Sequence, residues 1–159
     1  RSQTNTIEIH KENFSLLDEV LNCNEIVRTQ AENKSISLEI NVSKNIFLNS
    51  DKDMFKTILR NLLNNAIKFT PECGKVEISA KKHGNLTEIS VKDNGIGIDS
   101  EDLNYLFRID KNLKSREGTN NEKGSGLGLI LCKEFVDKLG GSISVESVAG
   151  KGTVFKLLL

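Results

Sequence analysis

The chain has 159 residues, 37% of them hydrophobic, and its 22 Lys and Arg balance 22 Asp and Glu. This length and composition predict one soluble globular domain, and the balanced charge argues against nucleic-acid binding, which usually requires a basic excess. The cysteines Cys23, Cys73 and Cys132 are too widely spaced to form a metal cluster and indicate a reduced, cytosolic compartment, and the sequence contains neither a signal peptide nor an apolar run of membrane-spanning length.

The first half of the chain predicts a helix, two short strands and a second helix. Apolar residues recur at helical spacing over about 15–33, and they alternate as in a strand over 36–42, before a second strand at 46–49. Ser50 and Asp51 are candidate N-caps for the second helix. This helix is predicted over 53–69, and Pro71 terminates it.

The second half predicts two hairpins, with a long polar segment and a helix between them. Gly84 and Asn85 form the first turn, the segment 150–152 forms the second, and a pair of glycines caps the helix. Runs of paired strands separated by helices predict an α+β fold, a two-layer sandwich of a mixed, mostly antiparallel sheet with helices on one face. The strands are predicted over 75–80, 86–92, 142–147 and 153–159, and the helix over 127–139.

One edge of the second helix carries a polar trio, Asn61, Asn65 and Lys68. On a helical wheel the three share an arc of about 60° next to the apolar stripe, so they border the buried face. An amide oxygen is a hard, neutral ligand suited to Mg²⁺, and a lysine one turn further on can contact a phosphate. The helix by itself fits either the wall of a phosphate-binding pocket or an ordinary solvated edge.

A turn rich in glycine, Asp93-Asn94-Gly95-Ile96-Gly97, follows the strand over 86–92. Two glycines allow a positive φ and a close approach of the backbone to a ligand. The Asp93 carboxylate can accept a hydrogen bond from an exocyclic amine, which adenine offers at that edge and guanine does not. The alternative is an ordinary Asp-Asn-Gly turn, and the dinucleotide pattern G-x-G-x-x-G is not met because position 100 is Ser.

A long, locally basic stretch separates Phe107 from the sequence Gly124-Ser125-Gly126-Leu127-Gly128, where a helix is predicted to begin. Structureless loops of this length are uncommon in compact domains, except as lids or disordered segments. The N-terminus of a helix binds anions, so a basic lid that ends there could close over phosphates. The Walker pattern is absent, so this segment is not a P-loop, and a disordered surface loop is the alternative.

The chain resembles the ATP-binding catalytic domain of sensor histidine kinases. The resemblance rests on N-L-L-N-N-A-I-K-F-T, D-N-G-I-G-I, a lid and K-G-S-G-L-G-L, in this order. That family has the Bergerat fold and belongs to the GHKL superfamily, with type II topoisomerases and mismatch-repair ATPases. Each motif alone is weak, but three in order with compatible spacing are strong. The resemblance covers residues 7–159 and implies that residues 1–6 are the tail of a preceding dimerisation helix or a linker.

The resemblance implies a role in binding Mg·ATP for each motif. Asn65 would coordinate Mg²⁺, Asn61 one turn earlier would support it, and Lys68 would contact phosphate. Asn61 and Lys68 would be the catalytic residues, and Asp93 would accept a hydrogen bond from the adenine amino group. The other implied ATP contacts come from the adenine wall and the lid: Phe69, for which plain core packing is the alternative, Gly95, Gly97, Phe107, Lys123, Gly124, Ser125, Gly126, Leu127, Gly128 and Thr153.

Two departures from the family pattern affect the expected mechanism. Phe107 matches the first aromatic residue of the family's phenylalanine motif, but Ile109 and Asp110 stand where a second is expected, which puts the closed packing of the lid in doubt. Related ATP hydrolases carry a Glu at the position of Asn61 as the general base for water. An amide cannot take that proton, so slow intrinsic ATP hydrolysis is expected.

The implied activity is that of a protein-histidine kinase in two-component signal transduction, which transfers the γ-phosphoryl group of Mg·ATP to a histidine. The family's acceptor histidine is followed by an acidic residue, whereas Lys11 follows His10 and Gly84 follows His83. Both histidines are therefore expected to be surface residues, and the acceptor is expected on a separate dimerisation domain.

The expected partners are ATP, this dimerisation domain and a response regulator, either separate or a receiver domain fused in the parent protein. No nucleic-acid partner is expected, and the isolated domain is expected to be a monomer. The domain is expected in the cytoplasm, with the parent protein either anchored in the inner membrane or not.

Three other functions remain open on the sequence. The first is a Ser/Thr protein kinase of the same superfamily that acts on a regulatory protein. The second is a degenerate, non-catalytic module that senses a nucleotide through lid closure. The third is an α+β interaction domain that binds no nucleotide.

Overall fold

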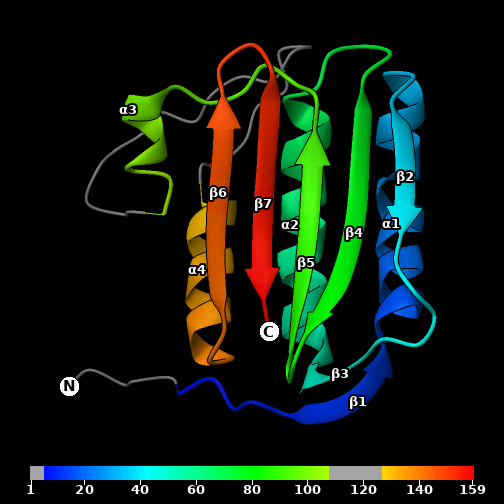
Figure 1. Ribbon diagram of the computed structural model, residues 1–159, viewed down its shortest axis with the longest axis vertical. Helices are drawn as coiled ribbons and strands as arrows, with labels where there is room; N and C mark the ends of the chain where they lie inside the picture. The colour runs from blue at the N-terminus through cyan, green and yellow to red at the C-terminus, as the bar shows by residue number, and fades with distance from the viewer. Residues whose placement is uncertain (1–5, 108–126) are drawn as a thin grey trace.

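The structure is a computed structural model that describes residues 6–107 and 127–159. In these residues the chain forms one main sheet, a short pair of strands at its end, and helices on one face of the sheet (Figure 1). The elements are β1 (Lys11–Ser15), α1 (Leu16–Asn33), β2 (Ser37–Asn41), β3 (Phe47–Asp51), α2 (Lys52–Lys68), β4 (Lys75–His83), β5 (Leu86–Asp93), α3 (Ser100–Leu103), α4 (Gly128–Lys138), β6 (Ser142–Val148) and β7 (Gly152–Leu158).

The main sheet has the strand order β2-β4-β5-β7-β6. β2 runs parallel to β4, and every other neighbouring pair is antiparallel. Both predicted hairpins, β4–β5 and β6–β7, are therefore confirmed, as is the mixed, mostly antiparallel sheet. The central pair β5–β7 joins segments that are far apart in the sequence and brings the end of β5 next to the start of β7.

The strand β3 does not join the main sheet. It pairs antiparallel with β1, a strand that the sequence pattern did not predict. Figure 1 shows this pair lying across one end of the main sheet. Phe14 is the only buried residue of β1, so the strand has no apolar alternation by which it could have been recognised.

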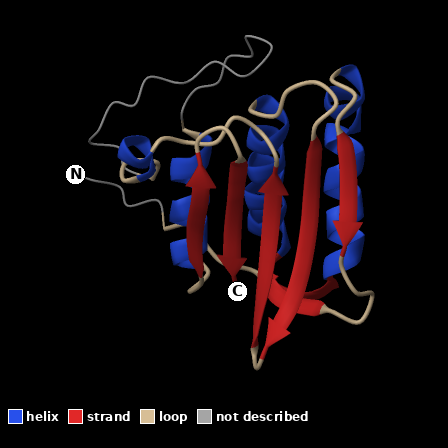
Figure 2. Ribbon diagram, turned by 45° about the horizontal axis from the view of Figure 1, so that its top comes forward, coloured by secondary structure: helices blue, strands red, loops and turns tan. Residues whose placement is uncertain are grey.

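The helices α1, α2 and α4 cover the same face of the sheet and leave the other face open (Figure 2). The predicted two-layer sandwich is therefore confirmed. On α1, the buried stripe runs through Leu16, Val20, Cys23, Val27 and Ala31. Two other apolar residues of this helix, Leu21 and Ile26, are exposed, because this stripe already fills the face that meets the sheet and α2.

The helix α2 lies between α1 and α4, and each of its ends is fixed by a side chain. Asp51, and not Ser50, is the N-cap, and its carboxylate accepts a hydrogen bond from Met54 N–H at 3.0 Å. At the other end, the buried Lys34 ammonium donates to the carbonyl oxygens of Ile67 at 2.8 Å and Lys68 at 3.2 Å. A cation at this end complements the helix dipole and satisfies terminal carbonyls.

No helix in the described part of the chain combines the length and the apolar character that crossing a bilayer requires.

Candidate functional site

The predicted polar trio lies on the exposed border of the most buried helix. Asn61, Asn65 and Lys68 are each half-buried, while the apolar residues of the adjoining stripe are buried, so the position derived from the helical wheel is confirmed. The Lys68 ammonium lies 5.0 Å from the centroid of the Phe69 ring, within the range of a cation–π interaction. This edge therefore presents two amide groups and one cation to the same side of α2.

Asp93 ends β5 and is a buried residue, with 6% of its surface exposed. Gly95 N–H donates to Asp93 Oδ1 at 2.9 Å, and Thr153 N–H also donates to this carboxylate. Burial raises the pKa of Asp93 to about 6, against the opposing effect of these two hydrogen bonds. A carboxylate has about four acceptor positions, so it retains capacity for a further donor such as an amino group.

The turn after Asp93 is held against the C-terminal end of α2. Ile96 N–H donates to the Phe69 carbonyl at 3.0 Å. A Cβ atom added to Gly95 would lie 2.2 Å from the same carbonyl oxygen, so only glycine permits this approach. The backbone contacts of Phe69 thus bring the two sequence motifs, the asparagine helix and the Asp93 turn, into one site.

Gly97 joins the same turn to the β6–β7 hairpin. Its φ of +72° and the 2.2 Å between an added Cβ and the Val148 carbonyl oxygen leave no room for a side chain. Gly150 N–H also donates to the Ile96 carbonyl at 2.7 Å. The two predicted glycines therefore shape the turn from opposite sides, Gly95 toward α2 and Gly97 toward the hairpin.

The start of α4 approaches the asparagine edge of α2. An added Cβ on Gly128, the first residue of α4, would lie 3.2 Å from Asn61 Oδ1. On the same side of α2, the buried Cys132 thiol donates to the Ile58 carbonyl oxygen at 3.6 Å, and burial raises its pKa to about 12. Leu127, just before the helix, has an exposed side chain. The N–H groups of the first turn of α4 therefore lie beside the amide groups of α2.

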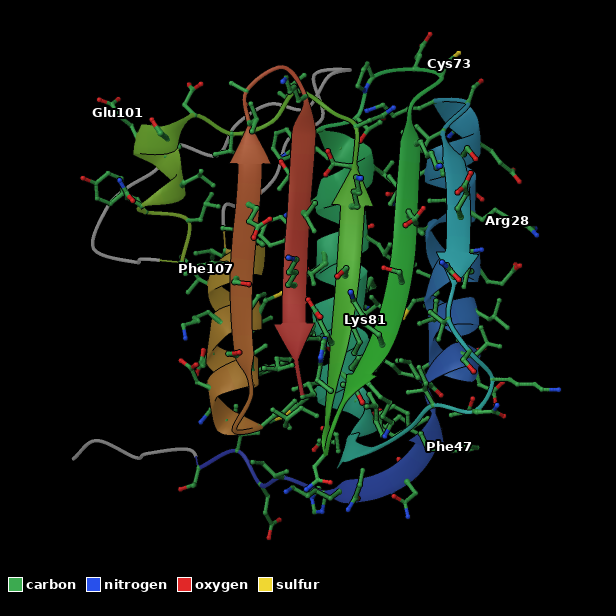
Figure 3. The ribbon with its side chains drawn as sticks, viewed as in Figure 1. Arg28, Phe47, Cys73, Lys81, Glu101 and Phe107 are labelled. Atoms are coloured by element: carbon green, nitrogen blue, oxygen red, sulfur yellow. The ribbon has the colours of Figure 1, made fainter. Side chains whose placement is uncertain are left out.

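Phe107 is packed against the core. Its ring lies 6.4 Å from the ring of Phe155, at an interplanar angle of 78° (Figure 3 labels Phe107). This contact supports a packing role, and its predicted contact with ATP stays a prediction. Lys123, Gly124, Ser125 and Gly126 lie outside the described residues.

An open hollow of about 610 Å³ lies near the Asp93 turn. It includes none of the residues predicted to contact the base, the metal or the phosphates, so the candidate site is placed by the contacts of Asp93 and α2 rather than by this hollow. Its lining residues are Ile98, Asp99, Ser100, Glu101, Ser147, Val148 and Ala149.

Two residues at the site were not predicted, Lys34 at the end of α2 and Ser147 on β6. The Ser147 hydroxyl lies 2.8 Å from Ile98 N, 2.9 Å from the Gly152 carbonyl oxygen and 2.8 Å from Thr153 Oγ1. Nothing in the local sequence distinguishes this serine from the other polar residues of an alternating strand. Its contacts depend on strand pairing, which a motif search does not see.

The chemistry of this arrangement fits a nucleoside triphosphate with a divalent cation. A buried carboxylate with acceptor capacity suits an amino group of a base, and the glycine cradle lets a flat ring approach the backbone. Neutral amide oxygens suit Mg²⁺, and a lysine and the start of a helix suit phosphates. In the described residues, these groups come from α2, β5, β7 and α4, so the fold and not one loop assembles the site.

Comparison with known proteins gives the same assignment. The family of histidine kinase-, DNA gyrase B- and HSP90-like ATPases matches residues 50–159. The chain is 34% identical over 148 residues to the sensor-like histidine kinase R01002 of Rhizobium meliloti, which covers 92% of this chain and 28% of that protein. The chain thus spans less than a third of that relative.

Solved structures show the same fold. The catalytic domain of histidine kinase ThkA has a TM-score of 0.82 at 24% identity, covering 94% of this chain and 95% of that chain. Full-length ShkA in complex with AMPPNP has a TM-score of 0.80 at 26% identity, covering 96% of this chain and 31% of that chain. These similarities do not favour a Ser/Thr kinase, a non-catalytic module or a domain that binds no nucleotide. The chain therefore belongs to the family of histidine kinase-, DNA gyrase B- and HSP90-like ATPases, as an ATP-binding catalytic domain of the sensor histidine kinase type.

Proposed function

We propose that this domain binds Mg·ATP and transfers the γ-phosphoryl group to a histidine on a separate dimerisation domain of its parent protein. The observation that carries the proposal is the buried Asp93 carboxylate, which keeps acceptor capacity and is held by the Gly95–Phe69 contact beside the amide edge of α2. Curated relatives that are named as sensor kinases, and the ShkA structure with AMPPNP, support the same activity.

Asp93 would accept a hydrogen bond from the adenine amino group, and Asn65 would provide an oxygen ligand for Mg²⁺, with Asn61 beside it. Lys68 would leave the Phe69 ring to contact a phosphate. The bound cation would supply charge neutralisation at the phosphates. The remaining described residues in the proposed binding site are Phe69, Gly95, Gly97, Phe107, Leu127, Gly128 and Thr153.

In the transfer, a bond forms between an imidazole nitrogen and the γ-phosphorus, and the bond from this phosphorus to the β–γ bridging oxygen breaks, so that ADP leaves. The contribution of this chain is positioning and electrostatic stabilisation, since phosphoryl transfer leaves little covalent work for the protein. Asn61 offers water no general base, because its side chain is a neutral amide. Hydrolysis in the absence of an acceptor histidine is therefore slow.

The proposed partners are the dimerisation domain and a response regulator. A structure of ThkA in complex with the response regulator TrrA supports the second. Neither histidine of this chain is proposed as the acceptor, because neither His10 nor His83 precedes an acidic residue. We further propose that residues 7–159 form the catalytic domain, a monomer when isolated, and that residues 1–6 belong to the preceding helix or linker.

The test is incubation of the parent protein with ATP labelled in the γ-phosphate, followed by acid and base treatment. The proposal expects a protein-bound phosphate that is labile in acid and stable in base, and that is lost when the acceptor histidine is replaced. Phosphate that resists acid would instead support a Ser/Thr kinase, and ATP binding without any transfer would support a nucleotide-sensing module. Either of these results would contradict the proposal.

A further inference from the structure

Three polar side chains lie in one row across the sheet at the proposed base-binding end. Asp93 on β5 is the register partner of Thr153 on β7, and Thr153 is the register partner of Ser147 on β6. Asp93 and Thr153 are each 6% exposed, and Ser147 is half-buried. The row begins at the carboxylate that is proposed to bind the adenine amino group and ends on a serine to which no role has been assigned.

The contacts of Ser147 determine the direction of each hydrogen bond in the row. Gly152 contributes a carbonyl oxygen, which can only accept, so the single Ser147 proton is donated to it at 2.9 Å. Ile98 contributes an N–H, which can only donate, and it donates to Ser147 Oγ at 2.8 Å. At 2.8 Å from Ser147 Oγ, the Thr153 hydroxyl must therefore be the donor.

This direction leaves the Thr153 hydroxyl oxygen able to accept further hydrogen bonds but not to donate one. Its only hydroxyl proton is used toward Ser147, so the lone pairs of Thr153 Oγ1 remain for other contacts. Beside it, the Asp93 carboxylate is likewise an acceptor. The two side chains nearest the proposed base would then both accept hydrogen bonds and neither would donate one.

We propose that Ser147 is a positioning residue that fixes the Thr153 hydroxyl as a hydrogen-bond acceptor, so that Thr153 and Asp93 together select a purine with an amino group at position 6. Adenine carries its donor hydrogens on the exocyclic amino group, whereas guanine presents a carbonyl oxygen at the corresponding place. Ser147 thus acts on base specificity without contacting the nucleotide. This inference rests on the proposed function, since it assumes that Asp93 faces the base.

Backbone packing keeps the row rigid. A Cβ added to Gly152 would lie 2.1 Å from the Asp93 carbonyl oxygen, and the Gly152 φ of +135° is strained for other residues. By accepting from Ile98, Ser147 also joins the glycine turn to the hairpin. Loss of the Ser147 hydroxyl removes the oxygen that accepts the Thr153 proton. The Thr153 proton is then available to point toward the base.

The test compares two nucleotides that differ only in the amino group, ATP and purine riboside triphosphate, both with Mg²⁺. Calorimetry gives the Kd of each for the wild type, Ser147→Ala and the control Ser144→Ala, which alters an exposed serine of the same strand. We expect Ser147→Ala to weaken ATP binding about tenfold and purine riboside triphosphate binding no more than about twofold. Ser144→Ala is expected to change neither.

A double-mutant cycle tests whether the effect passes through Thr153. In a Thr153→Val background, Ser147→Ala is expected to cause no further loss of ATP affinity, because the Thr153 hydroxyl that would accept from the base is already absent. Circular dichroism and thermal melting establish that each variant is folded. If Ser147→Ala does not fold, Thr153→Val alone provides the test. It must lose more affinity for ATP than for purine riboside triphosphate, and an unchanged ratio of the two Kd values would overturn the inference.

Three results overturn the inference while leaving the proposed function intact: an unchanged Kd for ATP in Ser147→Ala, an equal loss for both nucleotides, or additive losses in the cycle. A wild-type domain that binds neither nucleotide would instead remove the proposed function, and the inference with it.

Discussion

Burial of the charged Asp93 carboxylate lowers the stability of the nucleotide-free domain. Its pKa of about 6 in the folded chain exceeds the reference value of 3.8, because burial disfavours the charged form. The folded state therefore binds more protons than the unfolded state between these two values, and stability falls as the pH rises through this range. At neutral pH the charged carboxylate costs roughly 2–3 kcal/mol, as expected for a group kept for binding rather than for stability.

Replacing Asp93 by Asn should therefore stabilise the empty domain at neutral pH. We expect the free energy of unfolding to rise by roughly 1–3 kcal/mol at pH 7.5, and the gain to shrink toward pH 4, where the wild-type carboxyl is protonated. Urea unfolding at the two pH values measures this. Glu72→Gln, which alters an exposed carboxylate, is the control. A variant that is no more stable than the wild type at pH 7.5 would refute the assignment of this cost to Asp93.

Asn61 leads to a prediction about hydrolysis. Without an acceptor histidine, the domain is expected to release phosphate from Mg·ATP only slowly, because the side chain next to α4 is an amide and not a carboxylate. Phosphate release measured with excess Mg·ATP provides the test. A substantial rate that disappears in Asn65→Ala would show that this site supplies a general base after all.

The residues proposed to contact a ligand were easier to predict from the sequence than the residues that hold them in place. Asp93, Asn61 and Asn65 were recognised because they sit in short motifs with a chemical reason. Ser147 and Lys34 were not recognised, because their contacts join segments far apart in the sequence, Ser147 to Ile98 at 49 positions and Lys34 to Ile67 at 33. Short local patterns carry no information about such pairs.

Among the elements, β1 shows how a short strand can be missed and still contribute to the core. The Phe14 ring lies 5.6 Å from the ring of Phe55, a fully buried residue of α2. We expect Phe14→Ala to lower the free energy of unfolding by roughly 3 kcal/mol, from lost burial and the cavity left behind.

The matched control for Phe14 is Phe47, its neighbour in the same small sheet, which pairs with Ser15 and is 57% exposed. Phe47→Ala is expected to cost less than about 1 kcal/mol in chemical unfolding. Equal losses for the two variants would mean that the pair β1–β3 is not anchored to the core through Phe14.

The end of α2 depends on Lys34. Replacing this lysine by Met keeps most of its volume and removes the donor to the Ile67 and Lys68 carbonyls, so we expect a loss of roughly 1–3 kcal/mol in urea unfolding. Lys44→Met, at an exposed turn position, removes the same charge and should cost little. A Lys34→Met variant as stable as Lys44→Met would contradict the capping role.

For the whole molecule, the predicted layers and both hairpins were confirmed, while the pairing of β2 and β3 was not available from the sequence. Their spacing suits a hairpin as well as the observed arrangement, in which β2 pairs in parallel with β4 and β3 pairs with β1. The alternation of a strand gives its faces but not its neighbours. The site depends on this topology, since the order β5-β7-β6 places Asp93, Thr153 and Ser147 in one row.

The proposed ATP site is assembled by this fold around Asp93, and calorimetric titration of the domain with Mg·ATP measures whether that site binds. Wild type is expected to bind, and Asp93→Ala is expected to bind roughly 10- to 100-fold more weakly, as for the loss of a buried, charge-assisted hydrogen bond. Equal affinity in the two proteins, or no binding by a folded wild type, would rule out an ATP site that depends on Asp93.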